Sequence, residues 1–263
     1  MEINRNFLGK VVLITGSNRG IGAGIATEFA KRGAQLVITG RKPEPIQTVA
    51  KRCSDLSPNG RTALPVVADI SREDDCKKLI QTTVDAFNKI DILVNNADYG
   101  DYCDPLDPRF VSKLDKLLDV QLRAIVRLTQ LSVPYLAKTK GNIVNISMNL
   151  RTYSELALHS TAKSAINMFS KCAAAGLASH GIRVNIVVPG VMITKSLLGY
   201  GITHEMLKPF ADRLPVRRLG KIQDIASAVL YLADSVEARF ITGHSLYVEG
   251  GENVAHVFVD DYI

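Results

Sequence analysis

The chain has 263 residues, 46% of them hydrophobic and 22% charged, which is the balance of a soluble globular protein with a sizeable core. It has neither a basic segment followed by an apolar stretch nor a run of about 18 apolar residues, so we expect no signal peptide and no membrane span. The net charge of +6 is spread over short basic pairs without interleaved aromatic residues, which favours an anionic cofactor over nucleic acid. Four scattered cysteines at no metal-ligand spacing indicate free thiols in a reducing cytoplasm and no metal site.

Short apolar runs alternate with segments of helical periodicity along the whole chain. The runs are rich in Val and Ile and apolar on both faces, as are the strands of a covered parallel sheet. Strands are predicted at Val11–Thr15, Gln35–Thr39, Thr62–Ala68, Ile90–Asn95, Asn142–Ser147, Arg183–Val188 and Ser245–Val248. Helices are predicted over residues 20–32, 72–88, 112–138, 156–180 and 222–233.

This unbroken alternation predicts one doubly wound α/β domain over residues 1–263, with a seven-stranded, mainly parallel sheet and helices on both faces. The helix at 72–88 is expected to start with a capping box formed by Ser71 and Asp74. Residues 195–215 have weak periodicity and two prolines after a strand, so we predict a substrate lid there.

The turn after the first strand is the most informative segment. A buried strand enters it and a helix leaves it, within a unit of about thirty residues that is typical of a Rossmann-type dinucleotide site. Glycine lets the backbone approach a pyrophosphate, and the helix N-terminus offers unpaired N–H groups. A tight turn without a ligand is the alternative. The residues predicted to contact the dinucleotide here are Gly16, Ser17, Asn18, Arg19, Gly20, Ile21 and Gly22.

The end of the second strand bears on the choice between NAD and NADP. An NAD site has Asp or Glu at this point to bind the ribose hydroxyls, and the sequence has none. Arg41 and Lys42 stand there instead, and Arg19 lies in the glycine turn, so these cations suit a 2′-phosphate. The residues therefore favour NADP(H), with solvated surface arginines as the alternative.

The GxxxGxG spacing preceded by Thr15 resembles the short-chain dehydrogenase/reductase family, and the resemblance extends along nearly the whole chain. Asp69-Ile70 resembles its adenine-contacting segment, Asn95-Asn96-Ala97 its NNAG motif, Pro189-Gly190 with Thr194 its PG-xxx-T segment, and 247–251 its VDGG. It implies an oxidoreductase that assembles as a homodimer or homotetramer through the helices at 112–138 and 156–180. The further cofactor contacts that it implies are Asp69, Ile70, Asn95, Ala97, Lys163, Pro189, Gly190, Ile193 and Thr194.

The catalytic helix departs from the family's pattern. The segment from His159 to Lys163 resembles YxxxK, and the spacing of four places both residues on one helix face. Lys163 is present, but His159 replaces the proton-transferring Tyr. Imidazole titrates near neutral pH and could act as an acid or base, yet it reaches less far than a phenol, and a neighbouring ammonium favours its neutral form. A His without a catalytic role in an inherited cleft is the alternative.

Three further positions of the site are altered. The segment 142–148 resembles the family's strand ending in Ser-Ser, with Met148 at the usual catalytic position and Ser147 beside it. Because the following loop is shorter than usual, a local shift could bring Ser147 into place. Gln121 replaces the Asn that anchors a water relay, and Asp98 replaces the Gly of NNAG, which puts a negative charge near the cofactor. The candidate catalytic residues are Lys163, His159, Ser147 and Gln121.

Two hypotheses follow. The first is an NADP-dependent carbonyl reductase or alcohol dehydrogenase with an altered, slow active site. It would act on a small carbonyl or alcohol. The apolar residues of segment 195–215 suggest a lipophilic substrate, and a hydrophobic flap over the core is the equal alternative. The second is a catalytically inactive pseudoenzyme that binds NADP as a sensor or interaction protein. Tyr153, Tyr99 and Tyr102 could supply a phenol from a loop, but none has the helical spacing to Lys163.

Overall fold

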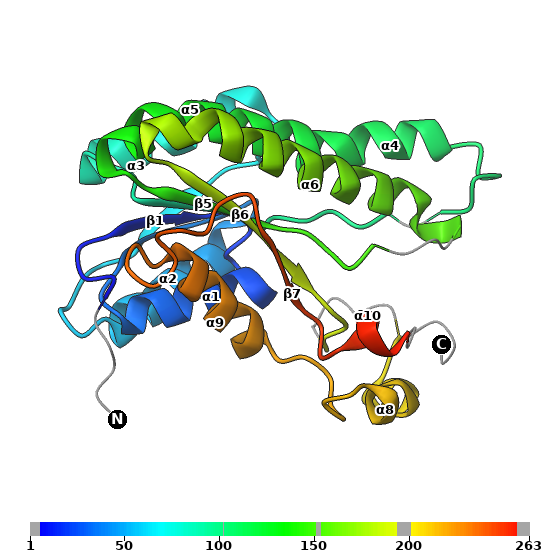
Figure 1. Cartoon of the computed structure of the whole chain (residues 1–263). Coiled ribbons are helices and arrows are strands. Elements are labelled where there is room, and N and C mark those ends of the chain that lie inside the picture. Colours follow the sequence, from blue (N-terminus) through cyan, green and yellow to red (C-terminus); the bar gives the residue numbers. More distant parts are fainter. Residues whose placement is uncertain (1–5, 102, 151–153, 194–200, 257–263) are drawn as a thin grey trace.

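The computed structural model describes residues 6–101, 103–150, 154–193 and 201–256, and a central parallel sheet runs through it (Figure 1). The strands pair in the order β3-β2-β1-β4-β5-β6-β7, so the predicted seven-stranded, doubly wound α/β fold is confirmed. Each predicted strand is present, with bounds that differ by no more than two residues. The strands are β1 (Val11–Ile14), β2 (Gln35–Gly40), β3 (Leu64–Val67), β4 (Ile92–Asn95), β5 (Asn142–Ile146), β6 (Arg183–Pro189) and β7 (Ser245–Val248).

Helices cover both faces of the sheet (Figure 1). One face carries α1 (Gly20–Lys31), α2 (Pro43–Leu56) and α9 (Ile222–Ala233). The other carries α3 (Glu73–Phe87), α5 (Ala124–Thr139) and α6 (Ala157–Leu177), which ends in a 3-10 turn, Ala178–His180. The shorter helices in the described part of the chain are α4 (Phe110–Leu118), a 3-10 turn (Ser154–Leu156), α8 (His204–Arg213) and α10 (Glu252–Ala255).

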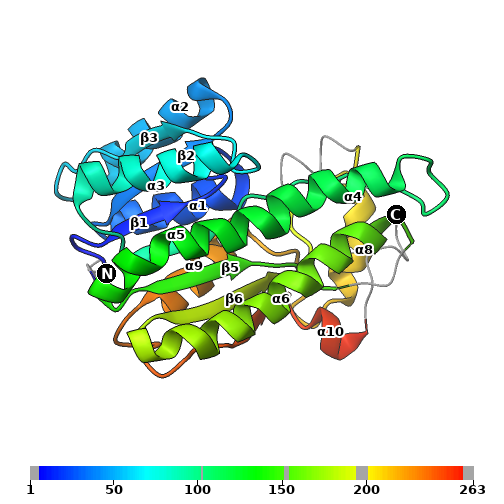
Figure 2. The same cartoon turned by 90° about the horizontal axis from the view of Figure 1, so that it is seen from above.

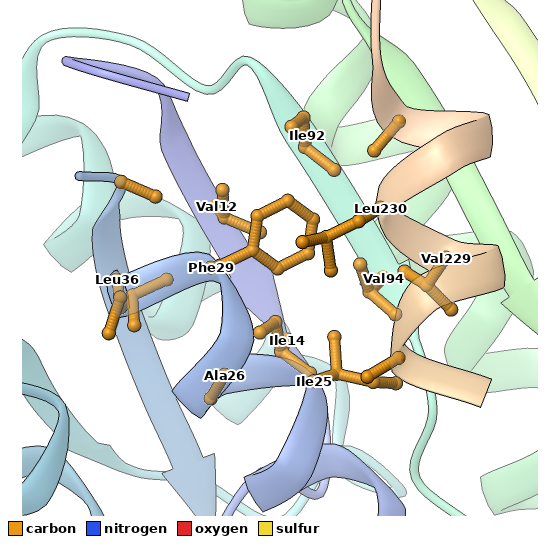
Figure 3. Packing of buried hydrophobic residues seen from close by; sticks show 14 of the residues in the cluster. Val12, Ile14, Ile25, Ala26, Phe29, Leu36, Ile92, Val94, Val229 and Leu230 are labelled. Atoms are coloured by element: carbon orange, nitrogen blue, oxygen red, sulfur yellow. The ribbon is translucent and has the colours of Figure 1, made fainter. Parts of the chain in front are cut away.

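Alternate strand residues fill two cores on opposite faces of the sheet. Val12 of β1 belongs to the core under α1 and α9, whereas the adjacent Leu13 belongs to the core on the other face. Phe29 of α1 lies next to Val12 and Leu230 of α9 in the first core (Figure 3). Its burial, like that of Leu13, is complete, so both faces of β1 hold the sheet to its helices.

The five predicted helices all form, and the longest has an interruption that the periodicity did not predict. The segment predicted as 112–138 consists of α4, a π-helical turn at Asp119–Arg123, and α5. Figure 2 shows α4 and α5 following one another alongside α6. A π turn adds one residue to a helical turn and thereby changes which side chains face a neighbouring helix.

Among the described residues three helices were missed: α2, α8 and the four-residue α10. α2 has prolines in its first turn, at Pro43 and Pro45, and few apolar residues. α8 occupies part of the predicted lid and buries Leu207 and Phe210. Residues 195–200 of that lid lie outside the described residues, and its role as a lid stays a prediction.

The capping box predicted at Ser71 and Asp74 is wrong. α3 begins at Glu73, with Arg72 at its N-cap and no side-chain cap. The Ser71 hydroxyl instead donates to Asp69 Oδ1 (2.8 Å), and Asp75 Oδ2 accepts from the Asp69 N–H (2.7 Å). Ser71 and Asp75 therefore bond to Asp69 in the turn after β3, and neither side chain caps α3.

The cysteines confirm one prediction made from their spacing. All four are free thiols, three of them buried and Cys172 exposed. In the part of the chain that the structure describes, no helix has the length and apolarity needed to cross a bilayer.

Candidate active site

The candidate site lies at the carboxyl ends of β1, β4, β5 and β6. The strand order reverses between β1 and β4, because β2 lies on one side of β1 and β4 on the other. In open α/β sheets the loops diverge at such a switch point and leave a crevice for a ligand. The glycine turn, residues 95–99 after β4, and the start of α6 all gather around this edge.

Two glycines of the turn are required by close packing. Gly16 has φ +62°, and a Cβ there would lie 2.8 Å from the Cα of Ala97. A Cβ on Gly22 would lie 2.4 Å from Nδ2 of Asn96. Neither position can take a larger side chain without moving backbone or a bonded amide. The turn is therefore packed directly against the segment that follows β4.

Hydrogen bonds fix the same turn on two sides. The Thr15 hydroxyl accepts from the backbone N–H groups of Asn96 (2.9 Å) and Ala97 (3.0 Å). The Ser17 hydroxyl accepts from the Thr39 N–H (2.9 Å), which joins the turn to β2. The predicted contact residue Ser17 is thus held inside the protein by its side chain, and what it can offer a ligand is its backbone.

The start of α1 is open. Gly20 has φ +57° and nothing within 4 Å of the position of a Cβ. Arg19 occupies the N-cap, and no side chain caps the helix. No side chain occupies the first N–H groups, so these groups and the positive end of the helix dipole suit an anion such as a pyrophosphate. Ile21 packs at the edge of the core on the α1 face.

The end of β2 is basic. Arg41, Lys42 and Arg19 are exposed, and none of them forms an ion pair with another described residue. A Cβ on Gly40 would lie 2.7 Å from the Asn18 amide, so a close approach brings the turn and the end of β2 together. The arrangement leaves three exposed cationic side chains near the junction of the glycine turn and the end of β2.

The predicted pair on α6 is buried at the sheet edge. His159 is 5% exposed and Lys163 3% exposed. Lys163 Nζ donates to the carbonyl of Ile146 at the end of β5 (3.3 Å) and forms an ion pair with Asp98 Oδ1 (3.1 Å). The ion pair was not predicted, although Asp98 had been recognised as the residue in place of a glycine.

Gln121 reaches the same cluster from the π turn. Its Nε2 donates to the carbonyl of Tyr99 (2.6 Å) and lies 3.1 Å from Nδ1 of His159. On the other side of the ring, His159 Nε2 lies 3.9 Å from Asp98 Oδ1. The structure thus brings three of the four predicted catalytic residues together and adds Asp98.

Ser147 follows β5 and forms no hydrogen bond with the cluster of His159, Lys163, Gln121 and Asp98 among the described residues. Its N–H donates to Val187, and its buried hydroxyl has no hydrogen-bond partner among the described residues. Asn145, two residues earlier, bonds Ser170 of α6 (2.7 Å). Since residues two apart on a strand share a face, Ser147 is directed toward the α6 face. No bond joins it to His159 or Lys163 in the described part, so its catalytic role stays a prediction; Met148 is half-buried.

Burial and the mutual charges set the protonation of the cluster. Burial lowers the pKa of His159, and the Lys163 ammonium adds to this, while Asp98 opposes it. For Asp98, burial favours the acid form, but the charges of Lys163 and His159 and the bond from Lys163 lower its pKa. At neutral pH the cluster therefore holds an ionised carboxylate and an uncharged imidazole.

Other predicted contacts have internal roles. Asn95 is 1% exposed, and its amide donates to Asn145 Oδ1 (2.8 Å), which links β4 to β5. A Cβ on Gly190 would lie 2.6 Å from the Cα of Glu249, so glycine is needed after Pro189. Ile193 packs against the α8 core, Ile70 is buried, and Thr194 lies outside the described residues.

Sequence reasoning also missed Glu252. It is fully buried at the start of α10, and its Oε2 lies 3.1 Å from the position of a Cβ on Gly190. A glutamate directly after Gly250-Gly251 was the only available signal, and sequence gives no reason to expect such a residue inside.

Comparisons with known proteins agree on one family. A family model described as Enoyl-(Acyl carrier protein) reductase matches residues 16–253. The chain is 33% identical to tropinone reductase-like 3 of Erythroxylum coca over 252 residues, which covers 95% of each chain. It is 31% identical to L-fucose dehydrogenase of Oryctolagus cuniculus over 257 residues, covering 95% of this chain and 87% of the relative. A crystal structure of a short-chain dehydrogenase/reductase of unknown function from Caenorhabditis elegans, with cofactor, is similar with a TM-score of 0.86 and 31% identity, over 98% of this chain and 99% of that one.

Proposed function

Because the chain belongs to the short-chain dehydrogenase/reductase family of oxidoreductases, we propose that it is an NADP(H)-dependent carbonyl reductase or alcohol dehydrogenase with an altered, slow active site. The observation that carries this proposal is the contrast within one crevice. The turn that would hold the pyrophosphate keeps its closely packed glycines and an uncapped helix start, while only Lys163 keeps the residue type of the family's catalytic pattern. The chain would therefore bind its cofactor well and turn over slowly.

The basic end of β2 supports NADP(H) over NAD(H). Arg41 and Lys42 are exposed and have no acidic partner among the described residues, and Arg19 lies across the turn. A 2′-phosphate would neutralise these cations, whereas the two ribose hydroxyls of NAD would leave them unpaired.

The remaining groups would orient the substrate. A bound nicotinamide supplies or accepts the hydride. Lys163 is fixed at the edge of β5, where it would hold the adjoining ribose, and the Asp98 carboxylate shares its ammonium and weakens that hold. His159 would face the reacting oxygen of a small carbonyl or alcohol. The names of the relatives, a fucose dehydrogenase and a tropinone reductase-like protein, support a small-molecule substrate of this class.

Exposed apolar side chains support assembly with further copies of the chain. Val111, Val126 and Met168 are 70%, 38% and 61% exposed on α4, α5 and α6. These helices are the ones that the family resemblance assigns to subunit pairing, and apolar residues scattered over them suit a homodimer or homotetramer.

Titration with NADPH and with NADH, followed by nicotinamide fluorescence, tests cofactor binding. Oxidation of NADPH with a panel of ketones and quinones then tests turnover, with His159→Ala as the variant. We expect tighter binding of NADPH than of NADH, and slow turnover that His159→Ala abolishes. Binding without turnover on any substrate would favour the inactive NADP-binding protein, and absence of binding to either dinucleotide would contradict both functions.

A further inference from the structure

We propose that Gln121 is a positioning residue that fixes His159 as a neutral imidazole with its proton on Nε2, so that His159 is a hydrogen-bond donor and not a base. This inference goes beyond the proposed oxidoreductase activity, because it concerns one proton on one ring. It rests on the geometry of four groups: the Tyr99 carbonyl, the Gln121 amide, the imidazole and the Asp98 carboxylate.

The Tyr99 carbonyl fixes the orientation of the Gln121 amide. The atom of Gln121 that lies 2.6 Å from this oxygen must be a donor, since a carbonyl oxygen can only accept. A flipped amide would place Oε1 of Gln121 against the Tyr99 carbonyl oxygen, and two oxygens would then be in contact. Its NH₂ group would move to the present position of Oε1, where no hydrogen-bond partner lies among the described residues. The Tyr99 phenol is engaged elsewhere, with Asp101 (3.1 Å), and does not compete.

The same NH₂ group then determines the state of the ring. Its nitrogen also lies 3.1 Å from Nδ1 of His159, so its second hydrogen is available to that ring nitrogen. A protonated Nδ1 would place N–H against N–H, so Nδ1 must carry the lone pair and accept. A neutral imidazole with a bare Nδ1 carries its proton on Nε2. The doubly protonated ring and the Nδ1–H tautomer are both excluded while this contact lasts.

The charges on the other side of the ring are compatible with this state. Asp98 Oδ1 lies 3.9 Å from His159 Nε2 and favours a proton there. Lys163, on the same helix as His159, bonds that carboxylate at 3.1 Å and neutralises much of its charge. Asp98 and Lys163 are the titratable groups that face the ring among the described residues, and burial of the ring adds to the preference for the neutral form.

The π turn explains why a glutamine can make this contact. Gln121 lies in the middle of residues Asp119–Arg123, packed beside α6, and is fully buried. Its Oε1 lacks a partner in the described residues, which is unfavourable for a buried amide and is offset by the two bonds of its NH₂ group. A side chain held this way has little freedom to turn over, and so the ring cannot exchange its tautomers easily.

The chemical consequence is that His159 can donate a hydrogen bond but cannot accept a proton at Nε2. In the assigned tautomer Nε2 has a hydrogen and no lone pair, so it can donate a hydrogen bond to a carbonyl oxygen but cannot receive a proton from an alcohol. Polarisation of a bound carbonyl is therefore the contribution that His159 can make, and a proton acceptor for the reverse direction has to be another group.

Nitrogen-15 NMR of protein with labelled histidine tests the proposal without cofactor or substrate. Protonated and unprotonated ring nitrogens resonate in separate regions, and His159→Ala identifies the signals of His159 among the five histidines. We expect an unprotonated Nδ1 and a protonated Nε2 at neutral pH. A protonated Nδ1 in the unaltered protein, as the tautomer or as imidazolium, would overturn the proposal.

Gln121→Glu sharpens the test, because a carboxylate would accept from Nδ1–H and stabilise imidazolium. We expect the titration midpoint of His159 to rise by about one to three pH units, whereas Gln130→Glu, an exposed site on α5, leaves it unchanged. An identical midpoint in the unaltered protein and Gln121→Glu would contradict the proposal. Failure to bind a dinucleotide would contradict the proposed function and leave this measurement intact, so the two failures are distinguishable.

Discussion

The two ends of the crevice are built from different parts of the chain. At the glycine turn, the shape is carried by backbone: Gly16 and Gly22 are packed against the segment after β4, and the start of α1 is left open. Around the start of α6, the function depends on side chains, and four of them differ from the pattern that the family resemblance implies: His159, Met148, Gln121 and Asp98. The contrast teaches that a packed backbone turn can be kept while the side chains next to it change.

The physical reason lies in what each end tolerates. A methyl group on Gly22 has no room, so this end allows almost no change of residue type. His159, by contrast, is accommodated because Gln121 and Asp98 give its two nitrogens partners or near neighbours. A side-chain cluster can find a second satisfied arrangement, whereas a packed backbone turn has one.

Gly22→Ala is the change with the largest expected effect. Its Cβ would lie 2.4 Å from Asn96 Nδ2 and 2.6 Å from the Gly16 carbonyl, so the turn must shift. Overpacking of this kind costs about 1–3 kcal/mol in the free energy of folding. If the turn shifts to relieve it, the same free energy is lost from binding, so we expect NADPH to bind up to about a hundredfold more weakly. Fluorescence titration measures it. Gly176→Ala is the control, since nothing lies within 4 Å of its Cβ and α6 should gain stability. Equal binding by both variants would mean that the turn does not hold the cofactor.

The fold was predictable because the strands carry their signal in composition. Seven apolar runs predicted the strands to within two residues, and the predicted helix 20–32 matches α1 to within one residue. α2 was missed because Pro43 and Pro45 suggest a loop, although proline is tolerated in a first helical turn. Its buried Ile46, Ala50 and Cys53 do recur at helical spacing, and this was the signal available.

The candidate site was predictable as a set of residues and not as a set of contacts. The spacing of His159 and Lys163 places them on one helix face, and the structure agrees. The meeting of Gln121 with His159 depends on the π turn, which no periodicity indicates. The ion pair between Asp98 and Lys163 depends on the path of the chain after β4, which the sequence pattern does not indicate.

Arg41→Ala combined with Lys42→Ala tests the basic end of β2. Both side chains are exposed, and their loss removes the charges that would meet a 2′-phosphate. We expect NADPH binding to weaken by about tenfold or more, with NADH binding changed little. Competitive titration with the two dinucleotides measures the ratio, and Lys51→Ala on the exposed face of α2 is the control. An unchanged ratio would argue against NADP(H) preference.

Asp98→Asn tests the ion pair between Asp98 and Lys163 at the α6 end of the crevice. Lys163 is buried and would lose its carboxylate, but Asp98 is 49% exposed, so we expect a loss of about 1–2 kcal/mol in the free energy of unfolding at pH 7. The pKa of Asp98 is lowered in the fold, so this stability is present above the unfolded value of about 3.9 and is lost as pH falls through the folded pKa. Urea unfolding at neutral and acidic pH should show the two proteins converging in acid. A gap that persists in acid would mean that the pair does not account for the loss.

His159→Gln gives the smallest effect and a different pH window. Burial lowers the pKa of His159, so below about pH 6.5 the unfolded chain takes up a proton that the folded chain does not. The unaltered protein should therefore lose up to about 1.4 kcal/mol per pH unit relative to His159→Gln, from about pH 6.5 down to the folded pKa. His180→Gln, at an exposed site, should follow the unaltered protein. Parallel pH profiles for the unaltered protein and His159→Gln would show that the ring is charged as easily inside the fold as outside it. In that case burial would not keep His159 neutral, and the side-chain cluster would lack the satisfied arrangement that sets it apart from the glycine turn.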